Sequence, residues 1–185
     1  MQFGVMSVSD ITTDPTNGRT PSEAERIQAA VTIAKHAEDI GLDVYAIGEH
    51  HNPPFFSSSP TTLLAYIAAQ TKNIIVSTST TLITTNDPVK IAEDYAMLQH
   101  LTNGRMDLMM GRGNTGPVYP WFGQDIRQGI PLAIENYALL RRLWEERTSI
   151  GRASSARHCA ASPQLRVRST ASRHSSGTDP FARPK

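Results

Sequence analysis

The stretch "DVYAIGEHHNPPF", residues 43–55, decides the fold prediction and raises the question of function. Its apolar run, Val44 to Ile47, has the length and composition of a short buried β-strand. A carboxylate and two histidines follow at residues 49–51, after a single glycine. Three titratable side chains therefore stand at the carboxyl end of a predicted strand, which is where parallel α/β folds bind their ligands.

The same arrangement, an apolar strand and then a helical segment, is predicted four times along the chain. Apolar runs predict strands at Phe3–Val8, Val44–Ile47, Ile74–Ser79 and Met106–Met110. Apolar residues at helical spacing predict helices at Pro21–Ile40, Leu63–Gln70, Pro88–Leu101 and Ile130–Glu146. This alternation indicates an α/β fold whose parallel sheet is covered by helices. Both an open doubly wound sheet and a barrel fit the pattern, but only a barrel requires the four strands in sequential order, with the first strand not between two others.

The composition changes at Arg147, which divides the chain into residues 1–146 and residues 147–185. The first part carries 10 Lys and Arg against 16 Asp and Glu, whereas the second carries 8 against 1. The second part has eight serines and seven arginines but only four Val, Ile, Leu or Phe, so we expect a basic, disordered tail without a packed core. The change falls inside the last predicted helix, with no Gly or Pro stop. This placement suggests the hypothesis that a reading-frame shift or truncation replaced the normal continuation.

Charge and cysteine content narrow the classes of function. The acidic body gives no indication of nucleic acid or a membrane as partner. The single cysteine, Cys159, excludes an intramolecular disulfide and fits a reducing compartment, so we expect a cytoplasmic protein. The apolar run Leu63–Ala69 is too short to span a bilayer, and no signal peptide is predicted. RNA binding by the tail is an alternative, but the tail offers one phenylalanine and no tyrosine or tryptophan for base stacking.

Three interpretations compete for Glu49, His50 and His51. A metal site would need further ligands, yet the H-E-x-x-H spacing is absent and no Cys/His cluster supports a third ligand, so we expect no metal. A structural pair would bond one histidine to Glu49. Acid–base or substrate-orienting chemistry is the third interpretation, because imidazole titrates near neutral pH.

Two loops after later strands carry further candidates. "GRGNTG", residues 111–116, matches the G-x-G-x-x-G pattern, but prolines follow it where a dinucleotide-binding loop would open a helix. It fits either a flexible loop or a loop whose backbone N–H groups and Arg112 face a phosphate. "STSTTLITTND", residues 77–87, fits a polar loop or a surface of small residues against which a flat ring can lie.

These residues, in this order, resemble the luciferase-like flavin-dependent monooxygenases. The resemblance covers residues 1 to about 146 and rests on "FGVM", "AKHAEDIGLDVYAIGEHH", "LAYIAAQTKNIIVSTSTTLITTNDPVKIAEDYAMLQHLTNGRMDLMMGRGN" and "WFGQD". It implies a (β/α)8 TIM barrel. It also implies reduced FMN, or alternatively a deazaflavin coenzyme, bound at the strand carboxyl ends, and oxygen or hydride chemistry on a small organic substrate. A flavin reductase as partner and a homo-oligomeric state are expectations of the same kind.

The resemblance assigns roles to five residues. His50 is similar to the family's active-site histidine beside the flavin ring. Ser79 and Thr80 match the pair that packs against the ring, often through a cis peptide. Arg112 matches a phosphate-contacting arginine, and Asn114 is a candidate for the same pocket. We expect His50 and Arg112 to point into one cleft with Ser79 and Thr80 as its floor.

The chain departs from the family because only about four βα units are found, half a barrel, followed by an unrelated tail. A half-barrel leaves two sheet edges unpaired and one sheet face uncovered. Besides the monooxygenase, two alternatives therefore stand, a non-catalytic flavin-binding or scaffold protein of the same fold and an inactive fragment. We also expect Glu49 to point away from His50 or to bond to backbone, since neighbouring residues on a strand alternate.

Overall fold

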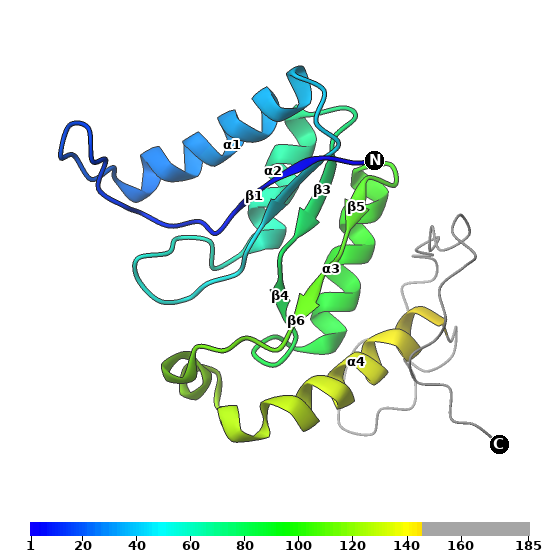
Figure 1. Ribbon diagram of the computed structural model, residues 1–185. Helices are drawn as coiled ribbons and strands as arrows, with labels where there is room; N and C mark the ends of the chain where they lie inside the picture. Colours follow the sequence, from blue (N-terminus) through cyan, green and yellow to red (C-terminus); the bar gives the residue numbers. More distant parts are fainter. Residues whose placement is uncertain (146–185) are drawn as a thin grey trace.

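The computed structural model describes residues 1–145, and its centre is a parallel sheet of four strands (Figure 1). The strand order is β1 (Gly4–Ser7), β2 (Val44–Ile47), β3 (Ile75–Thr78) and β5 (Met106–Asp107). Each strand pairs in parallel with the next, and β1 is at an edge of this sheet. The sequential order confirms the prediction made for a barrel and excludes a doubly wound sheet with the first strand central.

One predicted strand was wrong in detail. The run Met106–Met110 forms two short strands, β5 and β6 (Met110–Gly111), and β6 pairs in parallel with β4 (Thr81–Leu82) in a second small sheet. The physical reason is a side chain. The Thr78 hydroxyl donates to the Met109 carbonyl at 2.7 Å and accepts from the Met109 amide at 3.0 Å, so it takes the place of a backbone partner at this step of the ladder.

The helices begin where the local sequence supplies caps. Ser22 and Glu25 form a capping box at the start of α1 (Glu23–Asp39). Asp87 accepts from two amides at the start of α3 (Pro88–Leu101), and proline occupies the first position there and in α2 (Pro60–Gln70). The last helix is α4 (Gly129–Glu145). Two 3₁₀ helices that the sequence did not predict, η1 (Gly116–Phe122) and η2 (Ile126–Gln128), precede α4.

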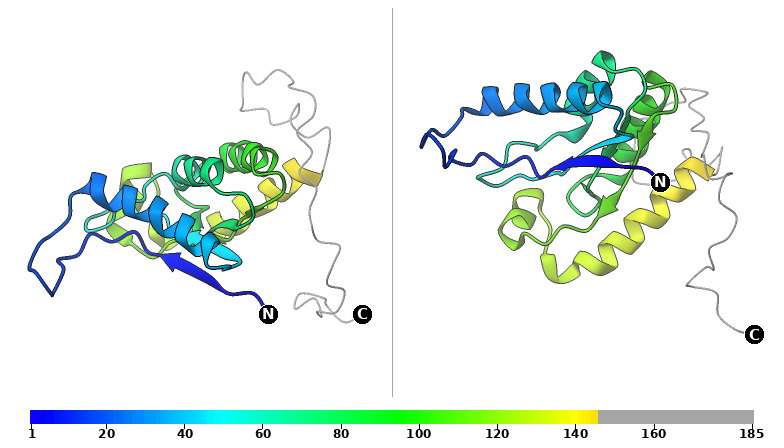
Figure 2. Two further views of the ribbon diagram at one scale, coloured as in Figure 1. Left: turned by 90° about the horizontal axis from the view of Figure 1, so that it is seen from above. Right: turned by 45° about the horizontal axis from the view of Figure 1, so that its top comes forward.

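The main core lies between the sheet and α1 and α2, and α3 runs along the same face of the sheet (Figure 2). Tyr45, Ile47 and Val76 point from the strands into this layer and are fully buried. A second cluster joins α3 to α4 through residues that include Tyr95, Leu98 and Leu140. None of the helices in residues 1–145 combines the length and apolar character needed to cross a membrane. The expected disordered tail, its boundary at residue 146 and the frame-shift hypothesis concern residues outside the described range.

Candidate functional site

The carboxyl ends of the strands are tied together by backbone hydrogen bonds just beyond the sheet. The Gly48 amide donates to the Ser7 carbonyl at 3.0 Å, and the Ser79 amide donates to the Ile47 carbonyl at 2.8 Å. The peptide bond between Ser79 and Thr80 is cis, as the resemblance implied. The carboxyl ends of β1, β2 and β3 therefore meet at one edge of the sheet.

Glu49, which is 4% exposed, anchors this edge through its carboxylate. Oε1 accepts from Nε2 of His51 at 2.9 Å and from Nδ2 of Asn86 at 2.7 Å, while Oε2 accepts from the Leu82 amide at 2.9 Å. The expectation that Glu49 bonds to backbone is confirmed. The structural-pair interpretation applies to His51, which also lies edge-on against Phe122 of η1 with ring centroids 4.7 Å apart.

His50 has a different environment from its neighbour. Its ring stacks on Phe55, with centroids 4.1 Å apart and planes 21° from parallel. Partial burial, and next the nearby His51, lower the pKa of His50, whereas the Glu49 carboxylate raises it. The net lowering of the pKa favours the neutral imidazole, which can accept a proton near pH 7.

Gly48 allows His50 to approach the end of β3. A Cβ at residue 48 would stand 3.1 Å from the Ser79 carbonyl oxygen and 3.2 Å from Nε2 of His50. Any side chain here would press on both groups. The structure thus brings His50 and Ser79 together around a backbone position that has no room for a larger residue.

A second close approach joins Thr80 to the loop that carries Arg112. A Cβ at Gly111 would stand 2.5 Å from Oγ1 of Thr80, so only glycine fits there without a shift. Arg112 and Asn114, which follow, are both exposed. That His50 and Arg112 share one cleft above Ser79 and Thr80 stays a prediction.

The backbone at Arg112 is held by two residues that the sequence analysis missed. The Thr84 hydroxyl donates to the Arg112 carbonyl at 2.5 Å, and the buried Tyr119 hydroxyl donates to the same carbonyl. Tyr119 lies in η1, between two prolines in "GPVYPWF". The sequence did contain one signal for this role, because an aromatic residue between two prolines follows the Gly-rich loop and could be expected to fix its backbone.

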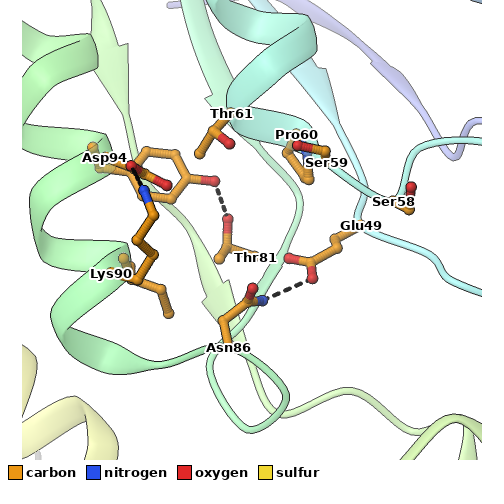
Figure 3. Close-up of a pocket in the computed structure, with 11 residues that line it drawn as sticks. Glu49, Ser58, Ser59, Pro60, Thr61, Thr81, Asn86, Lys90 and Asp94 are labelled. Carbon is orange, nitrogen blue, oxygen red and sulfur yellow. Dashed lines mark hydrogen bonds and ion pairs between the residues drawn. The ribbon is translucent and has the colours of Figure 1, made fainter. Parts of the chain in front are cut away.

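A cavity of about 160 Å³ lies on the helical side of Glu49, between the start of α2 and α3 (Figure 3). Several of its polar groups bond to one another. Thr81 Oγ1 and Tyr95 OH are 2.5 Å apart, and Lys90 forms an ion pair with Asp94. Glu49 lines this cavity, whereas none of the five residues to which the resemblance assigns roles does. Over residues 1–145, no group of three or more His, Cys, Asp and Glu side chains could hold a metal ion.

The chain is similar to known proteins along most of its length. The family model of luciferase-like monooxygenases matches residues 1–173. The chain belongs to the luciferase-like monooxygenase family. It has the α/β fold of these enzymes over about four βα units, as the resemblance implied.

The relatives are much longer than the matched part of this chain. The uncharacterized protein YwcH of Bacillus subtilis (strain 168) is 29% identical over 119 residues, which are 63% of this chain and 35% of YwcH. Monooxygenase RslO1 from Streptomyces bottropensis is 26% identical with a TM-score of 0.70, and the match covers 79% of this chain and 44% of RslO1. The oxygenating constituent of 3,6-diketocamphane monooxygenase from Pseudomonas putida, solved in complex with FMN, shares the fold with a TM-score of 0.70 at 23% identity, over 78% of this chain and 39% of that protein. The chain spans about a third of the length of the curated relatives it matches.

Proposed function

We propose that this chain carries part of the site of a flavin-dependent monooxygenase that acts with reduced FMN and O2 on a small organic substrate. The observation that carries the proposal is that Gly48 lies close to both His50 and Ser79, while Gly111, directly before Arg112, packs against Thr80. Family membership supports the reaction type.

The residues fit the two chemical parts of FMN. Ser79 and Thr80 are small, and the glycines at 48 and 111 bring neighbouring segments close to them, which suits a flat ring lying against backbone. Arg112 is exposed directly after the second of these glycines, and a guanidinium binds phosphate with charge-assisted hydrogen bonds. Asn114 is the neighbouring candidate for the phosphate side.

FMN in its reduced form would supply the electrons that activate oxygen. The proposed contribution of this chain is proton transfer and positioning. His50, whose pKa is lowered, would be neutral near pH 7 and able to take a proton at Nε2 or Nδ1. A reductase that delivers reduced flavin is the partner this chemistry calls for, and a deazaflavin is the alternative coenzyme.

A titration of the chain with FMN tests the proposal, with FMN fluorescence as the readout. We expect weak binding, with a Kd on the order of tens of micromolar or more. A half-barrel lacks part of the flavin contacts of a whole barrel, and each loss of about 1.4 kcal/mol weakens binding tenfold. Arg112→Ala should weaken binding of FMN further but leave binding of riboflavin, which lacks the phosphate, unchanged. The matched control is Arg127→Ala, an exposed arginine of η2 paired with Asp125. Submicromolar FMN binding that survives Arg112→Ala would overturn the assigned role.

A second candidate function is a non-catalytic flavin-binding protein or inactive fragment of the same family. The observation that favours it is coverage, since the chain matches 35–44% of the length of YwcH and RslO1. Oxygen consumption with reduced FMN separates the two candidates. Substrate-dependent oxygen uptake that falls in His50→Ala supports the enzyme, whereas flavin binding without such uptake supports the alternative. Parallel titration with a deazaflavin separates the two coenzymes.

A further inference from the structure

In residues 1–145, the face of the main sheet that lies opposite α1, α2 and α3 is exposed at its two edges, while its middle is half-buried at Ala46 and buried at Ser77. The strand register places one row of residues across this face, namely Met6, Ala46, Ser77 and Asp107. Successive residues on a strand point to opposite faces, and the neighbours Tyr45 and Val76 lie in the helix-covered core. The row therefore faces away from the helices.

This face, which we call the open face, is apolar at both of its edges. Met6 on β1 is 55% exposed and Val8, just after β1, is 42% exposed, while Met109 beside β5 is 51% exposed. The charged member of the row, Asp107, already accepts a hydrogen bond from Ser77 Oγ at 3.0 Å. Exposed apolar side chains beside unpaired parallel strands are surfaces that proteins normally cover.

The outer helix beside the β5 edge has a matching apolar stripe. Ile130, Ile134 and Tyr137 of α4 recur at helical spacing and are 62%, 66% and 47% exposed. Leu140, by contrast, is buried in the cluster against α3. One side of α4 is thus packed within the chain and another is available to an adjoining βα unit.

We propose that a second copy of this chain closes the open face, so that two four-stranded sheets form one eight-stranded barrel around a two-fold axis. In this arrangement β5 of each copy lies beside β1 of the other, in parallel. The closure is consistent with barrel packing, in which the side chains of one interior layer come from alternate strands. The first strand of the second copy would be the fifth strand of the barrel, so every odd-numbered strand of that copy is also odd-numbered in the barrel. The alternation of interior layers therefore continues from one copy to the other.

The occupant is a second copy rather than another segment of these 185 residues. The main-sheet strands begin at residues 4, 44, 75 and 106, so one βα unit takes 31–40 residues. Residues 146–185 number 40, enough for one unit where four are needed. In a two-fold pair, His50 and Arg112 of both copies lie at the same end of the barrel, where the strands have their carboxyl ends. The proposed dimer does not depend on flavin binding.

Sedimentation equilibrium of the 185-residue chain over a concentration series tests the proposal. We expect a single species of twice the 20.3 kDa chain mass. Met6→Lys should abolish this dimer at concentrations where the parent is dimeric, because it places a charge in the closed interior. Met97→Lys is the matched control, since Met97 is 53% exposed on α3, away from the sheet.

Circular dichroism establishes that each variant keeps its helices. If Met6→Lys fails to fold, Met109→Lys at the opposite edge of the open face decides in its place, because the two-fold arrangement requires both edges. A monomeric parent chain, open-ended assembly, or a dimer that survives the lysine at either edge overturns the proposal. The proposal is also overturned if the parent chain stays monomeric and associates only with an added C-terminal half of a relative.

Discussion

Replacing Glu49 with glutamine removes the charge that holds the strand ends together while keeping the size of the side chain. The carboxylate is almost fully buried and accepts three hydrogen bonds, two at Oε1 and one at Oε2. A glutamine has one acceptor oxygen and one donor nitrogen. With its oxygen at the Oε1 position it satisfies His51 and Asn86, but its NH₂ group then faces the Leu82 amide.

The size of the loss follows from that mismatch. A buried donor left without an acceptor costs about 1–3 kcal/mol, so the free energy of unfolding should fall by that amount. The opposite orientation sets the NH₂ group against the Asn86 donor, and His51 can accept from it only through a deprotonated Nε2. With a urea m-value of roughly 2 kcal/mol/M, a loss of about 2 kcal/mol lowers the unfolding midpoint by about 1 M.

Urea denaturation of the parent chain and the variant, followed by circular dichroism, measures this effect. Glu93→Gln, an exposed position on α3, is the control and should change stability by less than about 0.5 kcal/mol. Equal midpoints for Glu49→Gln and the parent would refute the reasoning. They would mean that the three hydrogen bonds do not hold the strand ends in solution.

Three further predictions address the site and the sheet. The pKa of His50, followed by NMR of its ring proton, should lie below 6.5 and rise in His51→Gln, because nearby His51 lowers it. His50 in the unfolded chain then binds a proton more readily than His50 in the folded chain, so its contribution to stability should decline as pH falls below 6.5. An unchanged pKa of His50 in His51→Gln would contradict this account. Tyr119→Phe should weaken FMN binding but not riboflavin binding, because the hydroxyl holds the backbone of the proposed phosphate loop; equal effects on both ligands would indicate a general structural role. Gly4→Ala should destabilise the fold by about 1–3 kcal/mol in urea, because its Cβ would stand 2.6 Å from a carbonyl oxygen of the neighbouring strand. Gly116→Ala, with its nearest contact at 3.8 Å, is the control, and similar midpoints for the two variants would count against the clash.

The local sequence was sufficient for the main elements. The strand Val44–Ile47 and the helix Pro88–Leu101 have the predicted bounds, because an apolar run between a loop and a glycine, and an Asp-Pro start, are signals contained in a few adjacent residues. The alternation of strands and helices also predicted the parallel sheet. The motifs at residues 49–51 and 111–116 marked two strand ends correctly, and the family followed from their combination.

Contacts between residues distant in sequence decided the rest. Thr78 interrupts the fourth predicted strand from 31 positions away, and Asn86 reaches Glu49 across 37 positions. The spacing of apolar residues does not reveal such partners. A hydroxyl or amide side chain in a polar stretch gives the same local sequence pattern whether or not the fold brings it to a buried hydrogen-bond partner. The sequence by itself therefore determined the main strands and helices and the family they belong to. Only the tertiary structure decided that Glu49 and His51 form an anchor, that His50 stands apart from them, and that Tyr119 holds the loop of Arg112, since each depends on packing that brings remote side chains within hydrogen-bond distance.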